Sequence, residues 1–174
     1  MTTPYCTKPL QKDPTTGALV EAPPTIVSPG AAASGACAGL NASGQLDLSV
    51  MPSGIGPDVQ TVITSEAVAA GALVNVYNAT GTPTCRNADN TTSGKEANGF
   101  VLAAVGSGVA ATVYGAGMNT QVTGLTAGAV FLGAAGGTTQ TVPSGAGKVL
   151  QRVGTAMAPG ELSFVPDHPI VLAS

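Results

Sequence analysis

Charged and aromatic side chains are both scarce in this sequence. Aspartate, glutamate, lysine and arginine together make up 9% of its 174 residues, against roughly 25% in ordinary soluble domains. Aromatic side chains account for only 3%, and tryptophan is absent. A core of small aliphatic side chains buries little apolar area per residue, and so few charges do little to keep a monomer in solution. We therefore expect a subunit that buries further surface in an assembly.

The same shortages exclude whole classes of partner. The six basic residues are scattered and the net charge is −3, so we expect no nucleic-acid binding through phosphate neutralisation. Hydrophobic residues reach 44%, yet no apolar run approaches the roughly 18 residues that span a bilayer, and we expect no membrane partner. The first residues lack the pattern of a secretory signal, so the widely spaced Cys6, Cys37 and Cys85 are expected to be reduced thiols.

Residues and motifs typical of catalytic sites are also scarce. The single histidine, His168, stands between Asp167 and Pro169, a setting typical of a surface turn. The stretch SGAGK at 144–148 resembles a phosphate-binding loop, but valines stand where that motif needs a glycine before it and a serine or threonine after it. No cysteine pair has the spacing of a zinc knuckle. The sequence therefore predicts no catalytic residue, no cofactor site and no metal site, and the protein is not expected to be an enzyme.

The strongest positive pattern lies in residues 126–142. It consists of an apolar strand around Phe131, a Gly136-Gly137 turn and a β-branched return strand, which together indicate a hairpin. The stretch 70–84 has the same arrangement roughly 53 to 57 residues earlier. We interpret this as a β unit used twice, in about residues 66–114 and 124–165. Chance similarity in a chain rich in glycine, alanine and threonine is the alternative.

Strand patterns with glycine and proline between them recur from Pro57 to the end of the chain, and no stretch holds a helical period for three turns. The predicted fold class is all-β: residues 57–174 form a compact β-barrel or β-sandwich with two related halves. Strands are expected over the apolar run 100–105 and at 120–123. The expected core consists of Phe100, Val101, Leu102, Val130, Phe131, Leu132 and Val153.

Residues 1–56 have a different composition. Proline is dense there, which disfavours both helix and central strand. Two interpretations are open, a disordered tail or an extended arm that becomes ordered on a neighbouring molecule, and the interspersed aliphatic residues favour the arm. The residues expected to anchor the arm during assembly are Leu10, Leu19, Val20, Ile26, Val27, Leu46 and Leu48.

Several stretches of the chain resemble small structural proteins of tailed bacteriophages, of the capsid decoration or cement type. These stretches are SEAVAAG at 65–71, VNVY at 74–77, KEANGFVL at 95–102, GLTAG at 124–128, VFL at 130–132 and PSGAGKVLQRVG at 143–154. They cover most of residues 59–174, and their order carries the resemblance more than any one of them. The resemblance implies a β-rich homotrimer that lies on the outer capsid surface, fastens neighbouring major capsid proteins and has no catalytic residues.

Two further expectations follow from this resemblance. The partners would be the major capsid protein and other copies of the chain, in the virion and, during assembly, in the host cytoplasm. The segment LNASGQLDLSVMP at 40–52 also resembles a segment of phage fibre and head proteins. A trimeric fibre or a receptor- or carbohydrate-binding module is therefore the alternative. It ranks second because only Tyr5, Tyr77 and Tyr114 could form an aromatic platform.

Overall fold

A computed structural model describes residues 10–13, 15–21, 26–27, 38–42, 44–47, 50 and 58–173. The chain divides into two units, Met1–Gly56 and Pro57–Ser174, which are described separately below. The described residues form strands, turns and loops, with no α-helix among them. The predicted all-β fold class is therefore confirmed: the chain contains a five-stranded barrel, a five-stranded antiparallel sheet and smaller sheets.

Among the described residues of the N-terminal unit, β1 (Leu10–Lys12) pairs antiparallel with β2 (Leu19–Glu21) in a short hairpin. Asp13 organises the turn, because its Oδ1 accepts the backbone N–H groups of Thr15 at 2.7 Å and Thr16 at 3.0 Å. These N–H groups, that of Thr16 foremost, lower the pKa of the Asp13 carboxyl below its usual value.

The first sheet of the second unit closes into a barrel in the order β3-β5-β4-β6-β7. Its strands are β3 (Val59–Thr64), β4 (Leu73–Ala79), β5 (Thr82–Asn87), β6 (Gly99–Phe100) and β7 (Ala110–Tyr114). The β4–β5 hairpin turns through Thr80 and Gly81, both with positive φ, which suits the twist of a tight hairpin. Closure comes from a short parallel pairing between β3 and β5, while every other pairing in the barrel is antiparallel.

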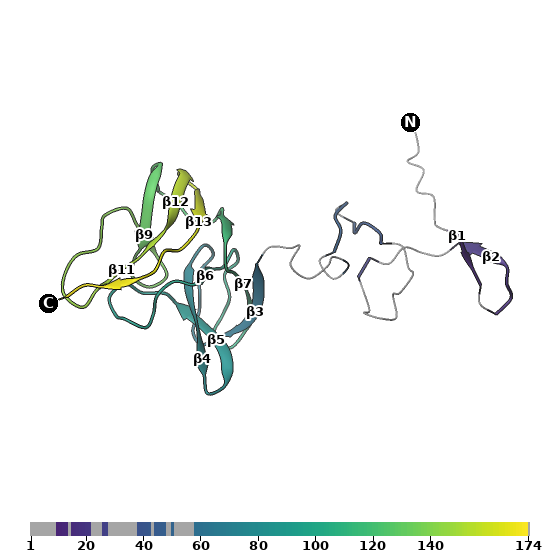
Figure 1. The fold of residues 1–174 in the computed structure, drawn as a ribbon, viewed down its shortest axis with the longest axis horizontal. Coiled ribbons are helices and arrows are strands. Elements are labelled where there is room, and N and C mark those ends of the chain that lie inside the picture. Colours follow the sequence, from purple (N-terminus) through teal and green to yellow (C-terminus); the bar gives the residue numbers. More distant parts are fainter. Residues whose placement is uncertain are drawn as a thin grey trace. The chain divides into compact units, whose positions relative to one another are not determined.

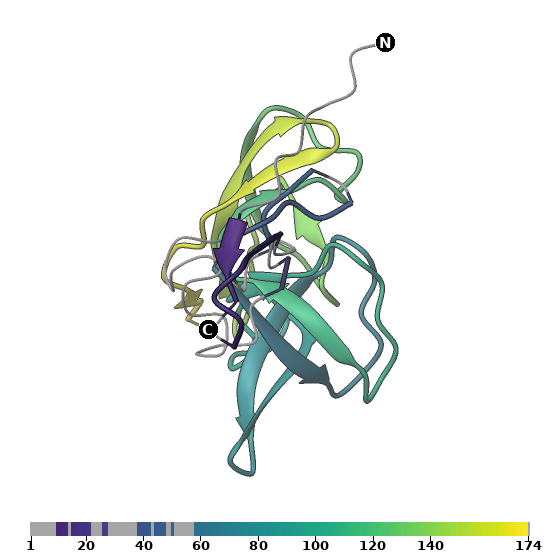
Figure 2. The ribbon, with the colours of Figure 1, turned by 90° about the vertical axis from the view of Figure 1, so that its right-hand side faces the viewer.

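The second sheet is open and antiparallel, in the order β10-β9-β12-β13-β8. Its strands are β8 (Gly117–Asn119), β9 (Gly128–Leu132), β10 (Thr138–Thr139), β12 (Arg152–Ala158) and β13 (Glu161–Phe164). A separate two-stranded sheet pairs β11 (Val149–Leu150) with β14 (Ile170–Val171). Figure 1 shows β9, β12 and β13 together on one side of this unit and the barrel strands on the other, and Figure 2 shows the same two groups from the side.

The two five-stranded sheets share one strand order. Opened between β3 and β5, the barrel has the order β5-β4-β6-β7-β3, which corresponds strand by strand to β10-β9-β12-β13-β8. The corresponding strands also follow each other along the chain in the same sequence. A common order is what a repeated β unit requires, while the duplication of about residues 66–114 and 124–165 stays a prediction.

Two apolar clusters stabilise this unit. One fills the barrel and includes Val62, Val74, Cys85 and Val113. The other lies where the two sheets meet, and it combines residues of both. Phe100 of the barrel is central to the second cluster, with its ring stacked on Tyr114 at 5.2 Å and edge-on to Phe164 of the open sheet at 5.3 Å.

Several sequence-based expectations need correction. Most of the expected core is buried, but Leu102 and Phe131 are only half-buried. Alternate residues of a strand face opposite sides, so with Val130 and Leu132 inside, Phe131 must point outward. The strand expected at 120–123 lies instead at β8, and the one expected over 100–105 ends at Phe100.

Candidate functional site

The predicted anchors of the arm lie on the surface of the N-terminal unit. Leu10 and Leu19 are 66% and 71% exposed, and the hairpin register, which pairs Lys12 with Leu19, places both leucines on one face. A lone two-stranded hairpin is at best marginally stable in water. Burial of this leucine face against another surface would therefore stabilise the hairpin.

The other predicted anchors are not gathered with this pair. Val20 points to the opposite face of the hairpin, and Ile26, Val27 and Leu46 are also exposed. Leu46 pairs with Leu40 across a separate turn, and Leu48 lies outside the described residues. The structure thus unites two of the seven predicted residues on one surface.

A second candidate surface, which the sequence analysis missed, is the outer side of the open sheet. Strand register aligns Ala129, Thr155, Ser163 and Met118 in one row across β9, β12, β13 and β8. All four point away from the shared core, and Phe131 and Arg152 face each other in the next row on the same side. We call this surface the open face. Its signal in the sequence is the period-2 alternation of residues 161–164, whereas residues 128–132 do not alternate between polar and apolar side chains.

The open face carries little charge. Arg152 lies along it, donating from Nη2 to Thr155 Oγ1 at 2.7 Å and standing 3.6 Å from Asp167 Oδ2. Glu161 lies at the opposite end of the β12–β13 hairpin, paired with Ala158. Because these side chains are well exposed to solvent, the Arg152–Asp167 pair adds little to stability. The surface is therefore neutral in its middle, with the Arg152–Asp167 ion pair at one end and Glu161 at the other.

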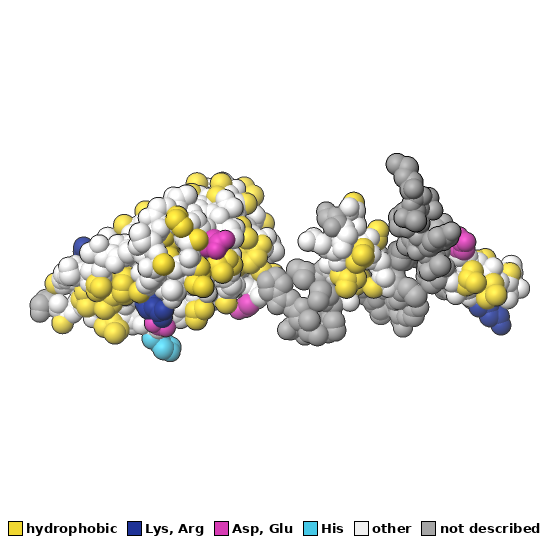
Figure 3. Space-filling model, turned by 90° about the horizontal axis from the view of Figure 1, so that it is seen from above, with side chains coloured by type: hydrophobic (Ala, Val, Ile, Leu, Met, Phe, Trp, Pro, Cys, Tyr) yellow, Lys and Arg dark blue, Asp and Glu magenta, His cyan; other side chains and the backbone are white. Residues whose placement is uncertain are grey.

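The neutral character extends over other parts of the second unit. In Figure 3 its visible face consists mainly of hydrophobic and uncharged side chains, with charged groups as isolated spots. Ile63, Val109 and Val142 are among the exposed aliphatic residues of this unit. Sparse charge, inferred from composition, is thus also a property of the folded surface.

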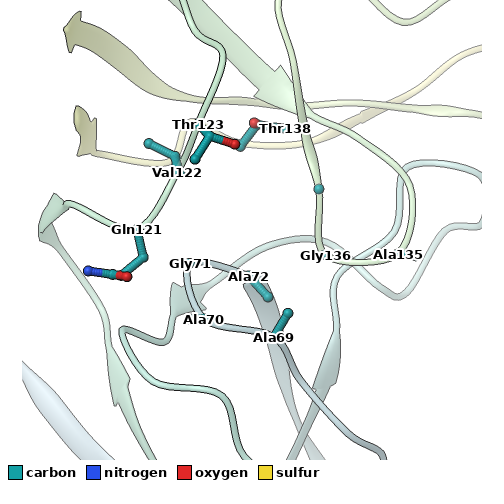
Figure 4. Close-up of a pocket in the computed structure, with 11 residues that line it drawn as sticks. Ala69, Ala70, Gly71, Ala72, Gln121, Val122, Thr123, Ala135, Gly136 and Thr138 are labelled. Carbon is teal, nitrogen blue, oxygen red and sulfur yellow. The ribbon is translucent and has the colours of Figure 1, made fainter. Parts of the chain in front are cut away.

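A pocket of about 230 Å³ lies where the open sheet fails to close. Figure 4 shows the turn at 69–72 opposite Gln121–Thr123 and the loop at 135–138. The barrel is tied to the open sheet here, because Leu73 N donates to Gly136 O at 2.8 Å and Asn119 Nδ2 donates to Gly71 O at 2.9 Å. Gly71, with φ +77°, must be glycine, since a Cβ would strike Gln121 O. Alanine methyls and backbone dominate the lining, so the pocket suits only a small neutral group.

A larger hollow of about 650 Å³ lies beside His168. Its polar side chains serve the backbone: Gln151 Oε1 accepts the N–H of Ala97 and Nε2 donates to the carbonyl of Ala97, each at 2.8 Å. The Asn98 amide likewise bonds both the N–H and the C=O of Val76. His168 itself is exposed. This arrangement organises loops and brings no nucleophile to the histidine.

The described residues contain no cluster of side chains suited to metal or thiol chemistry. No three His, Cys, Asp or Glu side chains gather there as metal ligands, and no described helix is long and apolar enough to cross a membrane. Cys85 is a free thiol buried in the barrel, where burial raises its pKa above the usual value. Cys6 and Cys37 lie outside the described residues.

Comparisons with protein-family models, with curated proteins and with solved structures find no match for this chain.

Proposed function

We propose that this chain is a structural virion protein that binds the outer surface of a phage capsid and fastens neighbouring major capsid proteins. In this role it acts without catalysis and without a cofactor, on the finished particle and in the host cytoplasm during assembly. The homotrimer implied by the resemblance to decoration proteins is part of the proposal.

The observation that carries the proposal is the exposed leucine face of the β1–β2 hairpin, in a unit that precedes an all-β domain poor in charge. Ordering an extended segment costs about 1 to 2 kcal/mol per residue in backbone entropy. Two exposed leucines cannot offset that cost in water, whereas their burial against another protein contributes about 1.5 to 3 kcal/mol each. A coat lattice offers such a surface.

The alternative, a fibre or carbohydrate-binding module, has no supporting observation in the described residues. Such a module would present free aromatic rings. The guanidinium of Arg86 covers the ring of Tyr77 at 4.2 Å, and Tyr114 stacks on Phe100. Tyr5 lies outside the described part of the chain.

The test is co-sedimentation of the full chain with shells assembled from the major capsid protein of the same genome. We expect the chain to bind, and the double variant Leu10→Ser/Leu19→Ser to bind at least tenfold more weakly, about 1.4 kcal/mol or more. The matched control is Val109→Ser/Val142→Ser, which changes two exposed valines of the second unit and should bind like the parent chain. Because charge is sparse, raising the ionic strength should release little protein.

Two results would count against the proposal. Absence of binding at saturating concentrations would exclude the capsid role itself. Equal binding by the leucine variant and the parent chain would leave the capsid role intact but would move the binding surface to the second unit.

A further inference from the structure

We infer that the open face of the C-terminal sheet binds the same face of a second copy of this chain across a two-fold axis. This inference goes beyond the proposed function, because the contact needs no coat protein. It rests on the structural counterpart of the face, on its composition and on the placement of its charges.

The counterpart of the open face is the interior of the barrel. When the two sheets are aligned strand by strand, Leu73 of β4 corresponds to Val130 of β9, because each pairs with the third strand of its sheet. Tyr114 of β7 likewise corresponds to Phe164 of β13 in the fourth strand. Aligning them sets Phe131 against Val74. The same alignment sets Ser163 against Val113, and both valines are fully buried. A side that is covered in one sheet is therefore left uncovered in the other.

The composition of the open face fits another sheet. The central row of Ala129, Thr155, Ser163 and Met118 holds only small or uncharged side chains. Met118 is 44% exposed, and Val165, beyond the end of β13, is 60% exposed. Flat rows of this kind pack face to face about 10 Å apart in β-sandwiches.

The charges favour a second copy of the chain as the occupant. A two-fold contact sets a surface against itself, so charge of one sign would repel its own copy. Here Glu161 lies at one end of the β12–β13 hairpin, and Arg152, with Asp167 beside it, lies at the other. A two-fold axis that reverses the strand direction places Arg152 of each copy over Glu161 of the other. At each end of the contact, the cation of Arg152 then faces two carboxylates, Asp167 of its own copy and Glu161 of the other.

The size of the face limits the strength of the contact. Five strands about 4.8 Å apart, with about four residues of 3.4 Å each, cover about 300 to 400 Å². A standard stable interface buries about 800 Å² on each partner. We therefore expect a weak dimer, with a Kd in the micromolar range or above.

The test is sedimentation equilibrium of the full chain over a range of concentrations. We expect the parent species to double its mass reversibly, from chain to dimer or from the proposed trimer to a hexamer, and we expect at least a tenfold higher Kd for Met118→Lys/Val165→Lys. Both positions are exposed, so the substitutions should spare folding, which the thermal unfolding midpoint checks. The matched control, Ile63→Lys/Val109→Lys, adds the same charge at exposed positions of the barrel unit and should dimerise like the parent chain.

A charge swap tests the orientation. Arg152→Glu and Glu161→Arg should each raise the Kd, and the double variant should restore it. A chain that is monomeric at all concentrations would overturn the inference, as would equal behaviour of the face and control variants. A trimer insensitive to Met118→Lys/Val165→Lys would also overturn it, while supporting the trimer of the proposed function. Failure of the double swap to restore association would overturn the two-fold arrangement.

Discussion

The barrel of β3–β7 and the open sheet of β8–β10, β12 and β13 arrange their strands in the same order, but only the barrel closes. In the barrel, Ile63 pairs with Thr84 and Thr64 with Cys85, and this parallel contact closes the sheet. By the same alignment, the corresponding segments of the open sheet are 121–122 and 136–137. These segments line opposite sides of the pocket in Figure 4, with the turn at 69–72 beside them. The turn at 69–72, which leads into β4 of the barrel, thus lies where the open sheet would otherwise close.

The difference teaches that strand order alone does not close a sheet. A small barrel needs an interior filled by side chains, and Val62, Val74 and Val113 supply that filling in the first sheet. Ser163 stands where Val113 would be. The closing strand also shortens, from six residues in β3 to three in β8. The second sheet lacks both the filling and the length, and therefore stays open.

The largest effect is expected at the residue that joins the two sheets. Phe100→Ala removes the ring that contacts both Tyr114 and Phe164, and should cost about 3 to 5 kcal/mol of unfolding free energy. Urea denaturation followed by circular dichroism would measure this. Because the cluster is shared, a single unfolding transition is expected for the second unit. Separate transitions for the barrel and the open sheet would show that the sheets are independent.

A pair of reciprocal substitutions sharpens the comparison. Val113→Ser places a hydroxyl in the barrel core and should cost about 2 to 4 kcal/mol, whereas Ser163→Val at the corresponding position should change stability by less than about 0.5 kcal/mol. Thermal or urea unfolding of the two variants provides the measurement. Similar costs at both positions would contradict the claim that one is interior and the other surface.

A smaller effect is expected at Phe131. Because its side chain is half-buried on the open face, Phe131→Ala should cost about 1 to 2 kcal/mol, well below the cost of Phe100→Ala. Urea unfolding at low protein concentration would measure this change in unfolding free energy without a contribution from self-association. A cost equal to that of Phe100→Ala would place Phe131 in the core after all.

The smallest effect concerns Cys85. Burial raises its pKa in the folded state, so the stability it contributes is full below the unfolded thiol pKa of about 8.5 and falls as the pH rises further towards the raised value. Unfolding free energy should therefore decline more steeply above about pH 8.5 in the parent chain than in Cys85→Ala. Thiol titration of the denatured, unreduced chain should recover all three cysteines. Recovery of one would mean that two are bridged.

Local patterns predicted the fold where one residue type decided the structure. The Gly136-Gly137 turn and the β4–β5 hairpin follow from glycine and β-branched residues. The side on which each residue of an apolar run lies did not follow: in Val130-Phe131-Leu132, only the paired strands show which residue points out. The open face was missed for the same reason, because Met118, Ser163 and Thr155 come together only through the strand register.

The two hydrogen bonds between the Asn98 side-chain amide and the backbone of Val76 affect how this protein ages chemically. An asparagine before a glycine, as in Asn98-Gly99, is ordinarily the site at which a chain loses ammonia through a cyclic imide. Asn98 is held by its oxygen at 2.7 Å and by its nitrogen at 2.8 Å from the backbone of Val76, and Gly99 lies buried in β6. The side-chain carbonyl therefore cannot swing towards the next peptide nitrogen without breaking both bonds. Peptide mass spectrometry after prolonged incubation should find Asn98 intact in the folded chain and converted in the unfolded one.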